Sequence, residues 1–225
     1  MTQVVYYGCL DNMFGYDIEP VRDRFVNDTP NIQFCPAFNG YIKNVFAVKS
    51  MYQYSIDWDG VNITSSMYDQ VFFNTNLFIR DVNIGFFSYV SPKPVFVSEG
   101  DDLNITQEFP YFHDNDITRN MYIIPGTFNI GKHLPRTLEM SGKFKRPGSI
   151  TINEGDVLYY VRFHTKEKII FKKFIFSEEM KSVIKNNLSI REHTKNRKSL
   201  SWWYNFVSRH NLKKYFLNEI KKNLL

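Results

Sequence analysis

Short runs of β-branched and aromatic residues recur along the first three quarters of the chain, separated by Gly, Pro and Asn. Their spacing of about 8–15 residues is typical of an antiparallel sandwich or barrel and not of alternating βαβ units. The runs predict strands at Thr2–Tyr7, Ile42–Val48, Tyr54–Trp58, Gln70–Phe73, Phe78–Ile79, Ile84–Val90, Pro94–Ser98, Met121–Ile124, Ser149–Ile152, Val157–Phe163 and Ile169–Phe176. The predicted fold class is all-β, with an antiparallel, jelly-roll-like sandwich over residues 1–176.

One predicted connection is tighter than the others. The segment Asn153-Glu154-Gly155-Asp156 lies between two strand-like runs and has the composition of a short turn. We therefore expect a hairpin between Ser149–Ile152 and Val157–Phe163.

The pattern changes to a helical period after Phe176. Ser177 has the chemistry of an N-cap, and the acids that follow it suit the positive end of a helix dipole. A helix is expected over about residues 177–188. A second is expected over about 200–224, where Leu212, Phe216, Ile220 and Leu224 recur every four residues. Residues 177–225 are thus predicted to form a helical appendage.

Charge divides the chain in the same way. Residues 1–165 hold 13 Lys+Arg and 18 Asp+Glu, whereas residues 166–225 hold 15 Lys+Arg and 5 Asp+Glu. This asymmetry predicts a basic appendage on a mildly acidic body. Candidate docking residues are Trp202, Trp203, Tyr204, Phe206, Leu212, Lys213, Lys214, Phe216 and Ile220.

Three interpretations of these docking residues stay open. They dock the appendage onto its own body or a neighbouring copy, they bind a partner in trans, or they bind nucleic acid or a membrane surface through their aromatic and basic side chains. No apolar run approaches the ~18 residues of a membrane span, and the N-terminus lacks a signal-peptide pattern. We expect a location in the cytoplasm of a bacterial host or in a virion.

Motifs of catalysis are missing. The sequence has no nucleophile elbow, P-loop or dinucleotide fingerprint, and Cys9 and Cys35 are expected as buried thiols. The acid-rich run Glu99–Asp102 lacks calcium-loop spacing and is expected to be a solvated turn. We therefore predict a non-catalytic protein that needs no cofactor.

One alternative is a jelly-roll enzyme that uses Fe(II) or another divalent metal. A facial triad needs two His and one carboxylate. His113, with Asp114 or Asp116, and the distal His164 supply those residue types, and Arg162 is the candidate anchor for an anionic co-substrate. The spacing departs from His-x-Asp, because the carboxylates follow His113 at +1 and +3. The hypothesis requires these side chains to converge.

Several body segments resemble an all-β domain family of unknown function found in bacteria and tailed phages, including marine cyanophages. The matching segments are Asp28–Asn31, Cys35–Gly40, Trp58–Gly60, Ile124–Phe128 and Phe144–Ile150 with the following Ile152–Leu158. The resemblance covers about residues 3–176 and none of the appendage. It implies a sandwich fold and carries over no functional residue. The sequence thus favours a structural or binding module, phage-encoded or virion-associated, that uses residues 177–225 for assembly or partner docking.

Overall fold

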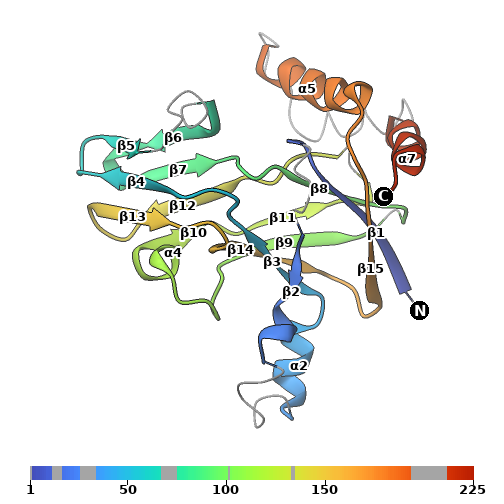
Figure 1. The fold of residues 1–225 in the computed structure, drawn as a ribbon, viewed down its shortest axis with the longest axis horizontal. Helices are drawn as coiled ribbons and strands as arrows, with labels where there is room; N and C mark the ends of the chain where they lie inside the picture. The colour runs from blue at the N-terminus through green and yellow to red at the C-terminus, as the bar shows by residue number, and fades with distance from the viewer. Residues whose placement is uncertain are drawn as a thin grey trace.

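Strands dominate the architecture (Figure 1). The computed structural model describes residues 2–11, 17–25, 34–66, 75–100, 102–132, 135–193 and 212–225. Within these ranges the strands form four sheets. The paired strands are antiparallel, apart from β1 and β15, which run parallel. The predicted all-β class with antiparallel sheets is confirmed.

Each sheet draws strands from distant parts of the chain. The first has the order β15 (Lys168–Lys173), β1 (Thr2–Cys9), β8 (Pro94–Ser98). The second has the order β10 (Met121–Ile123), β12 (Met140–Phe144), β7 (Phe86–Tyr89), β6 (Leu77–Asp81). The third has the order β11 (Gly126–Asn129), β9 (Asn104–Glu108), β14 (Val157–Phe163), β3 (Val45–Lys49), β2 (Glu19–Pro20). The fourth has the order β13 (Gly148–Ile152), β4 (Tyr54–Trp58), β5 (Ile63–Ser66).

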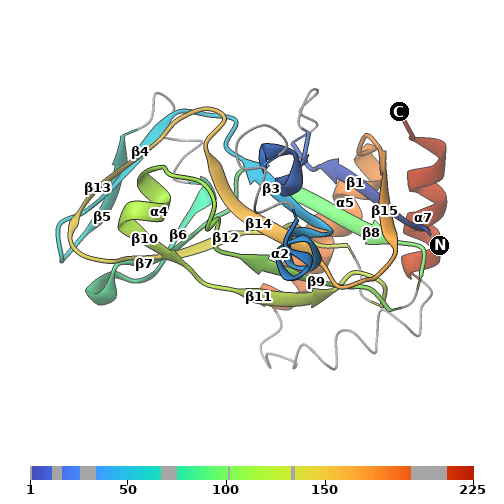
Figure 2. The ribbon, with the colours of Figure 1, turned by 90° about the horizontal axis from the view of Figure 1, so that it is seen from below.

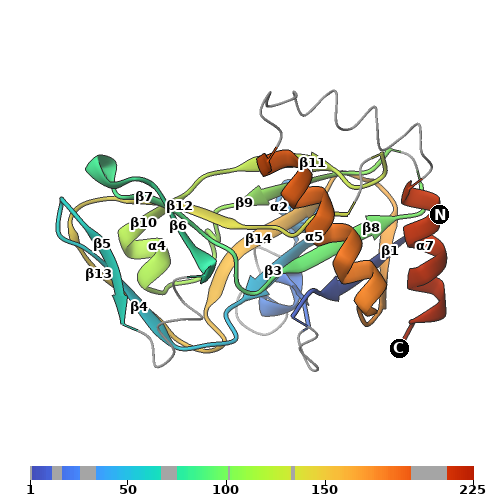
Figure 3. The ribbon, with the colours of Figure 1, turned by 90° about the horizontal axis from the view of Figure 1, so that it is seen from above.

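The described helices lie around these sheets. They are η1 (Val21–Phe25), α2 (Pro36–Ile42), η2 (Val82–Ile84), α4 (Asp116–Asn120), α5 (Glu178–His193) and α7 (Leu212–Lys222). Figures 1 and 3 place α5 and α7 at the β15-β1-β8 end of the molecule. None of the described helices combines the length and apolar character needed to cross a membrane.

One large apolar cluster runs through the sheets. In β4 and β12 buried side chains alternate with half-exposed ones, as expected for strands with one face in a core. Figure 2 shows the β13-β4-β5 sheet facing the β10-β12-β7-β6 sheet, with α4 between them. Two smaller clusters flank this core, one under α5 and α7 and one under η1. The C-terminal helices therefore share an apolar cluster with the body.

The predicted hairpin at Asn153–Asp156 is wrong. β13 and β14 do not pair with each other. β13 pairs with β4 and β14 pairs with β3, so residues 148–163 run antiparallel to residues 45–58 with a bend in the middle. At the bend, the Gly155 N–H donates to Ser50 O, and the Ser50 N–H donates to Asp156 O, both at 2.8 Å. Gly155 has a φ of 85°, which a glycine adopts without strain. Residues 153–156 thus form a bulge between two consecutive stretches of strand pairing, whereas the sequence pattern predicted that the chain would reverse direction there.

Other strand predictions differ in accuracy. The bounds of β4, β8 and β14 are those predicted. The run at Ile42–Val48 is split, because Ile42 ends α2 and β3 begins at Val45. The predicted strand Gln70–Phe73 lies outside the described residues. Cys9 is buried as expected, but Cys35 is exposed, so the prediction for that thiol is wrong.

Candidate functional site

The C-terminal helices are anchored on the β15-β1-β8 sheet. Of the predicted apolar stripe, Leu212 is only half-buried, and Leu224 lies beyond the end of α7 and is 39% exposed. Phe216 and Ile220 of α7 are buried, as the four-residue period predicted. They pack with apolar side chains of β1, β8, α5 and the segment between β15 and α5. These are Tyr6, Val95, Val97, Phe174, Phe176, Met180 and Ile184. Trp202, Trp203, Tyr204 and Phe206 lie outside the described residues.

Polar contacts fix α7 to the loop after β8. Lys221 Nζ lies 2.8 Å from Glu99 Oε1, and Lys213 Nζ donates to Gly100 O at 3.1 Å. Tyr6 OH donates to the same Glu99 oxygen at 2.5 Å. The bonds from Lys221 and Tyr6 lower the pKa of Glu99, whereas burial and that carboxylate raise the pKa of Tyr6 to about 12. Lys214, the other candidate lysine, is exposed. The acid-rich loop is therefore a docking point for the basic helix, and not simply a solvated turn.

The chain after α7 joins the sheet edge through its backbone. The Ile175 N–H donates to Asn223 O at 3.1 Å, and the Leu225 N–H donates to Lys173 O at 3.0 Å. Phe174 and Leu224 form an antiparallel bridge. Ser177 caps α5 as expected, since its hydroxyl accepts the Met180 N–H at 3.2 Å. Residues 194–211 therefore connect two helices that are both held on the body.

The metal-site candidates lie around β14. His113 follows β9 in a loop and lines an open cleft of about 480 Å³. The other lining residues come from β2, η1, β3, the His113 loop and the bend before β14. They are Glu19, Pro20, Val21, Asp23, Arg24, Ala47, Lys49, Asp114, Asn115, Gly155, Asp156 and Val157. His113 Nδ1 lies 2.6 Å from Tyr160 OH. Because the Tyr160 oxygen already accepts the Phe112 N–H, we assign the phenol proton to this contact, with His113 Nδ1 as acceptor.

His113 is expected to make stability depend on pH. Burial, with the nearby charges of Arg24 and Lys49, lowers its pKa from 6.5 to about 4 against the opposing effect of Glu19. The unfolded chain therefore binds more protons between pH 6.5 and 4, so stability from this group is present above pH 6.5 and lost as pH falls towards 4. Solvent screening of the half-buried ring limits the loss to about 1 kcal/mol.

A variant isolates that contribution. In His113→Asn the amide oxygen still accepts from Tyr160, but nothing titrates. Urea unfolding of both proteins at pH 7 and pH 4.5 should show a larger loss for the wild type than for the variant. Equal losses would contradict the assignment.

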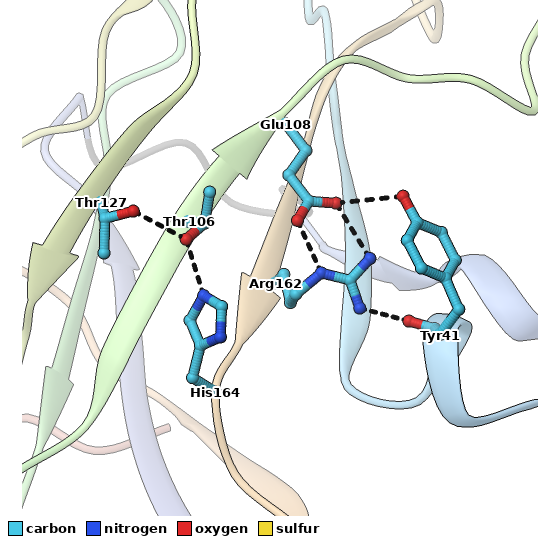
Figure 4. Close-up of polar contacts among 6 residues, drawn as sticks. All are labelled: Tyr41, Thr106, Glu108, Thr127, Arg162 and His164. Carbon is cyan, nitrogen blue, oxygen red and sulfur yellow. Dashed lines mark hydrogen bonds and ion pairs between the residues drawn. The ribbon is translucent and has the colours of Figure 1, made fainter. Parts of the chain in front are cut away.

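Arg162 is paired within the fold (Figure 4). Its Nε lies 2.6 Å from Glu108 Oε1 and its Nη2 lies 3.0 Å from Glu108 Oε2, while Nη1 donates to Tyr41 O. The guanidinium also lies 4.1 Å from the centroid of the Tyr41 ring. Arg162 therefore ties α2 to β9 and β14. Arg162 was the candidate anchor for an anionic co-substrate, but its guanidinium already binds the Glu108 carboxylate.

The remaining candidates have separate partners. His164 Nε2 lies 2.6 Å from Thr106 Oγ1, which lies 2.9 Å from Thr127 Oγ1 (Figure 4). Asp114 accepts two bonds from Arg119, each at 2.7 Å. Asp116 Oδ2 accepts the Thr151 N–H at 3.0 Å.

The convergence required by the metal hypothesis is not found. No group of three His, Cys, Asp or Glu side chains that could hold a metal occurs among the described residues. The physical reason is the strand itself. His113 contacts Tyr160, whereas His164 lies four residues further along extended chain, a separation of about 13 Å. The Arg162–Glu108 pair stands between them.

Glu99 and Glu108 were not selected from the sequence. Nothing in the sequence around Glu108 indicated a partner, because its contact with Arg162 depends on how β9 pairs with β14. For Glu99 a signal existed, since an acid-rich loop is complementary to a basic helix. Comparison with known protein families, curated proteins and solved structures gave no match to the chain.

Proposed function

We propose that the protein is a non-catalytic structural module that assembles with further copies of itself through its C-terminal region, residues 177–225. The observation that carries the proposal is the anchoring of α5 and α7 on the body. These helices flank residues 194–211 in the chain, and those residues include Trp202, Trp203, Tyr204 and Phe206 with four Lys+Arg and no acid. A connection between two anchored helices loses less conformational freedom on binding than a free tail.

Charge favours a second copy as the partner. Residues 1–165 carry five more acids than bases, whereas residues 166–225 carry ten more bases than acids. The basic segment of one copy is therefore complementary to the body of another, and such pairing steers association. The setting we propose is a tailed-phage particle or the cytoplasm of its bacterial host. The finer fold that we propose is a jelly-roll-like sandwich, supported by the facing sheets around one core.

The test replaces residues 194–211 with a Gly/Ser linker of equal length in the full chain. Sedimentation velocity should show the wild type as an oligomer that salt weakens, and the variant as a monomer. The thermal unfolding midpoint should stay unchanged, because α5 and α7 remain in place. A matched variant, Trp202→Ala with Trp203→Ala, should weaken assembly with all charges retained. A linker variant that assembles like the wild type would refute the proposal.

A further inference from the structure

The outer face of the β10-β12-β7-β6 sheet carries aromatic side chains in a defined register. Residues 140, 142 and 144 of β12 point into the core, so Ser141 and Lys143 lie on the opposite face. Strand pairing puts Tyr122 and Phe86 on either side of Lys143 in one row. In the next row, Phe78 pairs with Ser88. Ile124 donates its N–H to Ser141 O at the other edge.

These rings are accessible. Tyr122 is 56% exposed and Phe78 is 44% exposed, although both belong to paired strands. The polar groups between them hold one another in place. Ser88 Oγ lies 2.9 Å from Ser141 Oγ, and Arg80 Nε donates to Ser88 Oγ at 3.0 Å. The face is therefore a fixed platform with rings at its edges.

A cation accompanies each exposed ring. Lys145 Nζ lies 5.3 Å from the centroid of the Tyr122 ring, and Arg80 Cζ lies 5.5 Å from that of Phe78. Lys143 is half-exposed in the middle of the face.

Two acids border the platform, and both have partners. Glu139 pairs with Arg80 at 3.2 Å, and Asp81 Oδ1 accepts the Asn83 N–H at 3.0 Å. Lys143, Lys145 and Arg80 against these two acids leave the platform with a net positive charge. Lys145 Nζ also donates to Thr118 O at 2.9 Å and to Arg119 O at 3.0 Å, which holds it beside the Tyr122 ring.

We propose that this platform binds single-stranded nucleic acid. Aromatic rings on a flat antiparallel sheet stack on unpaired bases, and neighbouring Lys and Arg contact the phosphates. A duplex hides its base faces in its own stack, so it gains only the phosphate contacts. The bases stack on Tyr122 and Phe78, and the backbone passes Lys143. The platform contains none of residues 177–225, so the inference does not rest on the proposed assembly.

The experiment measures fluorescence anisotropy of labelled oligo(dT) and oligo(U) of about 15 nucleotides, and of a duplex of equal length. The full chain should bind the single strands at least tenfold more tightly than the duplex, and affinity should fall as salt rises from about 50 to about 200 mM. Tyr122→Ala with Phe78→Ala should weaken binding by about tenfold or more. Lys143→Ala should weaken binding and reduce the slope of log affinity against log salt by about 1.

Two controls make the result specific. Tyr215→Ala removes a ring that is 46% exposed but lies on α7, which contributes no residue to the platform, and it should leave the affinity unchanged. The variant with residues 194–211 replaced should also bind like the wild type, which separates the platform from the basic segment. Thermal unfolding midpoints verify that the substituted exposed residues leave the fold intact. Equal affinity for single strand and duplex, absence of binding, or an unaffected Tyr122/Phe78 double variant would overturn the proposal.

Discussion

Replacing Phe216 with alanine should lower the free energy of unfolding by about 3–5 kcal/mol, the usual loss for a large buried ring. Phe216 is fully buried, and its ring centroid lies 6.3 Å from that of Phe176. The substitution leaves a cavity between α7 and the β15-β1-β8 sheet, where Val95 and Val97 also contribute to the cluster. Urea unfolding followed by fluorescence measures the loss.

The neighbouring residue provides the control. Tyr215 lies on the same helix but is 46% exposed, so Tyr215→Ala should change stability by no more than about 0.5 kcal/mol. A Phe216→Ala protein that unfolds at the wild-type urea concentration would show that α7 does not contribute to the folded body.

Glu108→Ala should cost about 2–3 kcal/mol of stability, somewhat below the usual range for breaking a fully buried ion pair. The side chains of Arg162 and Glu108 are only 14% and 17% exposed, and the carboxylate accepts two bonds from the guanidinium. Burial acts to lower the pKa of Arg162, and Glu108 raises it. Because a guanidinium titrates far above pH 7 even without a partner, Arg162 stays charged when Glu108 is removed. The loss is mainly the cost of leaving that charge unpaired.

Two further variants test that explanation by urea unfolding. Glu108→Met combined with Arg162→Met removes both charges and should be less destabilising than Glu108→Ala alone. Asp114→Ala breaks an Arg–carboxylate pair of the same two-bond geometry, but its partners are 73% and 59% exposed. That change should have little effect, because water already solvates both groups. Equal losses for Glu108→Ala and Asp114→Ala would contradict the role of burial.

Strands with strong apolar patterns were predictable, and strands with interruptions were not. β4 alternates apolar and polar residues, β14 is a nearly continuous apolar run, and the bounds of both were predicted without error. β12 was missed because its sequence, Met-Ser-Gly-Lys-Phe, has a glycine at its centre. That glycine has a packing reason, since a Cβ at Gly142 would lie 2.2 Å from Met121 Cε. The constraint comes from a strand about twenty residues away along the chain and is invisible locally.

Some contacts of the candidate site were predictable from the sequence and others were not. The inward face of α7 followed from its four-residue period, so Phe216 and Ile220 were predictable. The partners of His113, Arg162 and His164 were not, because Tyr160, Glu108 and Thr106 reach them through strand pairing and loop geometry. Residue types alone suggested a metal triad, whereas the register distributes the same residues among separate contacts.

The molar mass of the full-length protein in solution is the most direct test of the proposed assembly of a metal-independent structural module. Size-exclusion chromatography with light scattering, with metal content measured on the same fraction, gives both quantities. We expect a mass at least twice the 26.7 kDa of one chain and no stoichiometric transition metal. A mass of 26.7 kDa at every concentration, with about one equivalent of iron or another transition metal, would contradict the account.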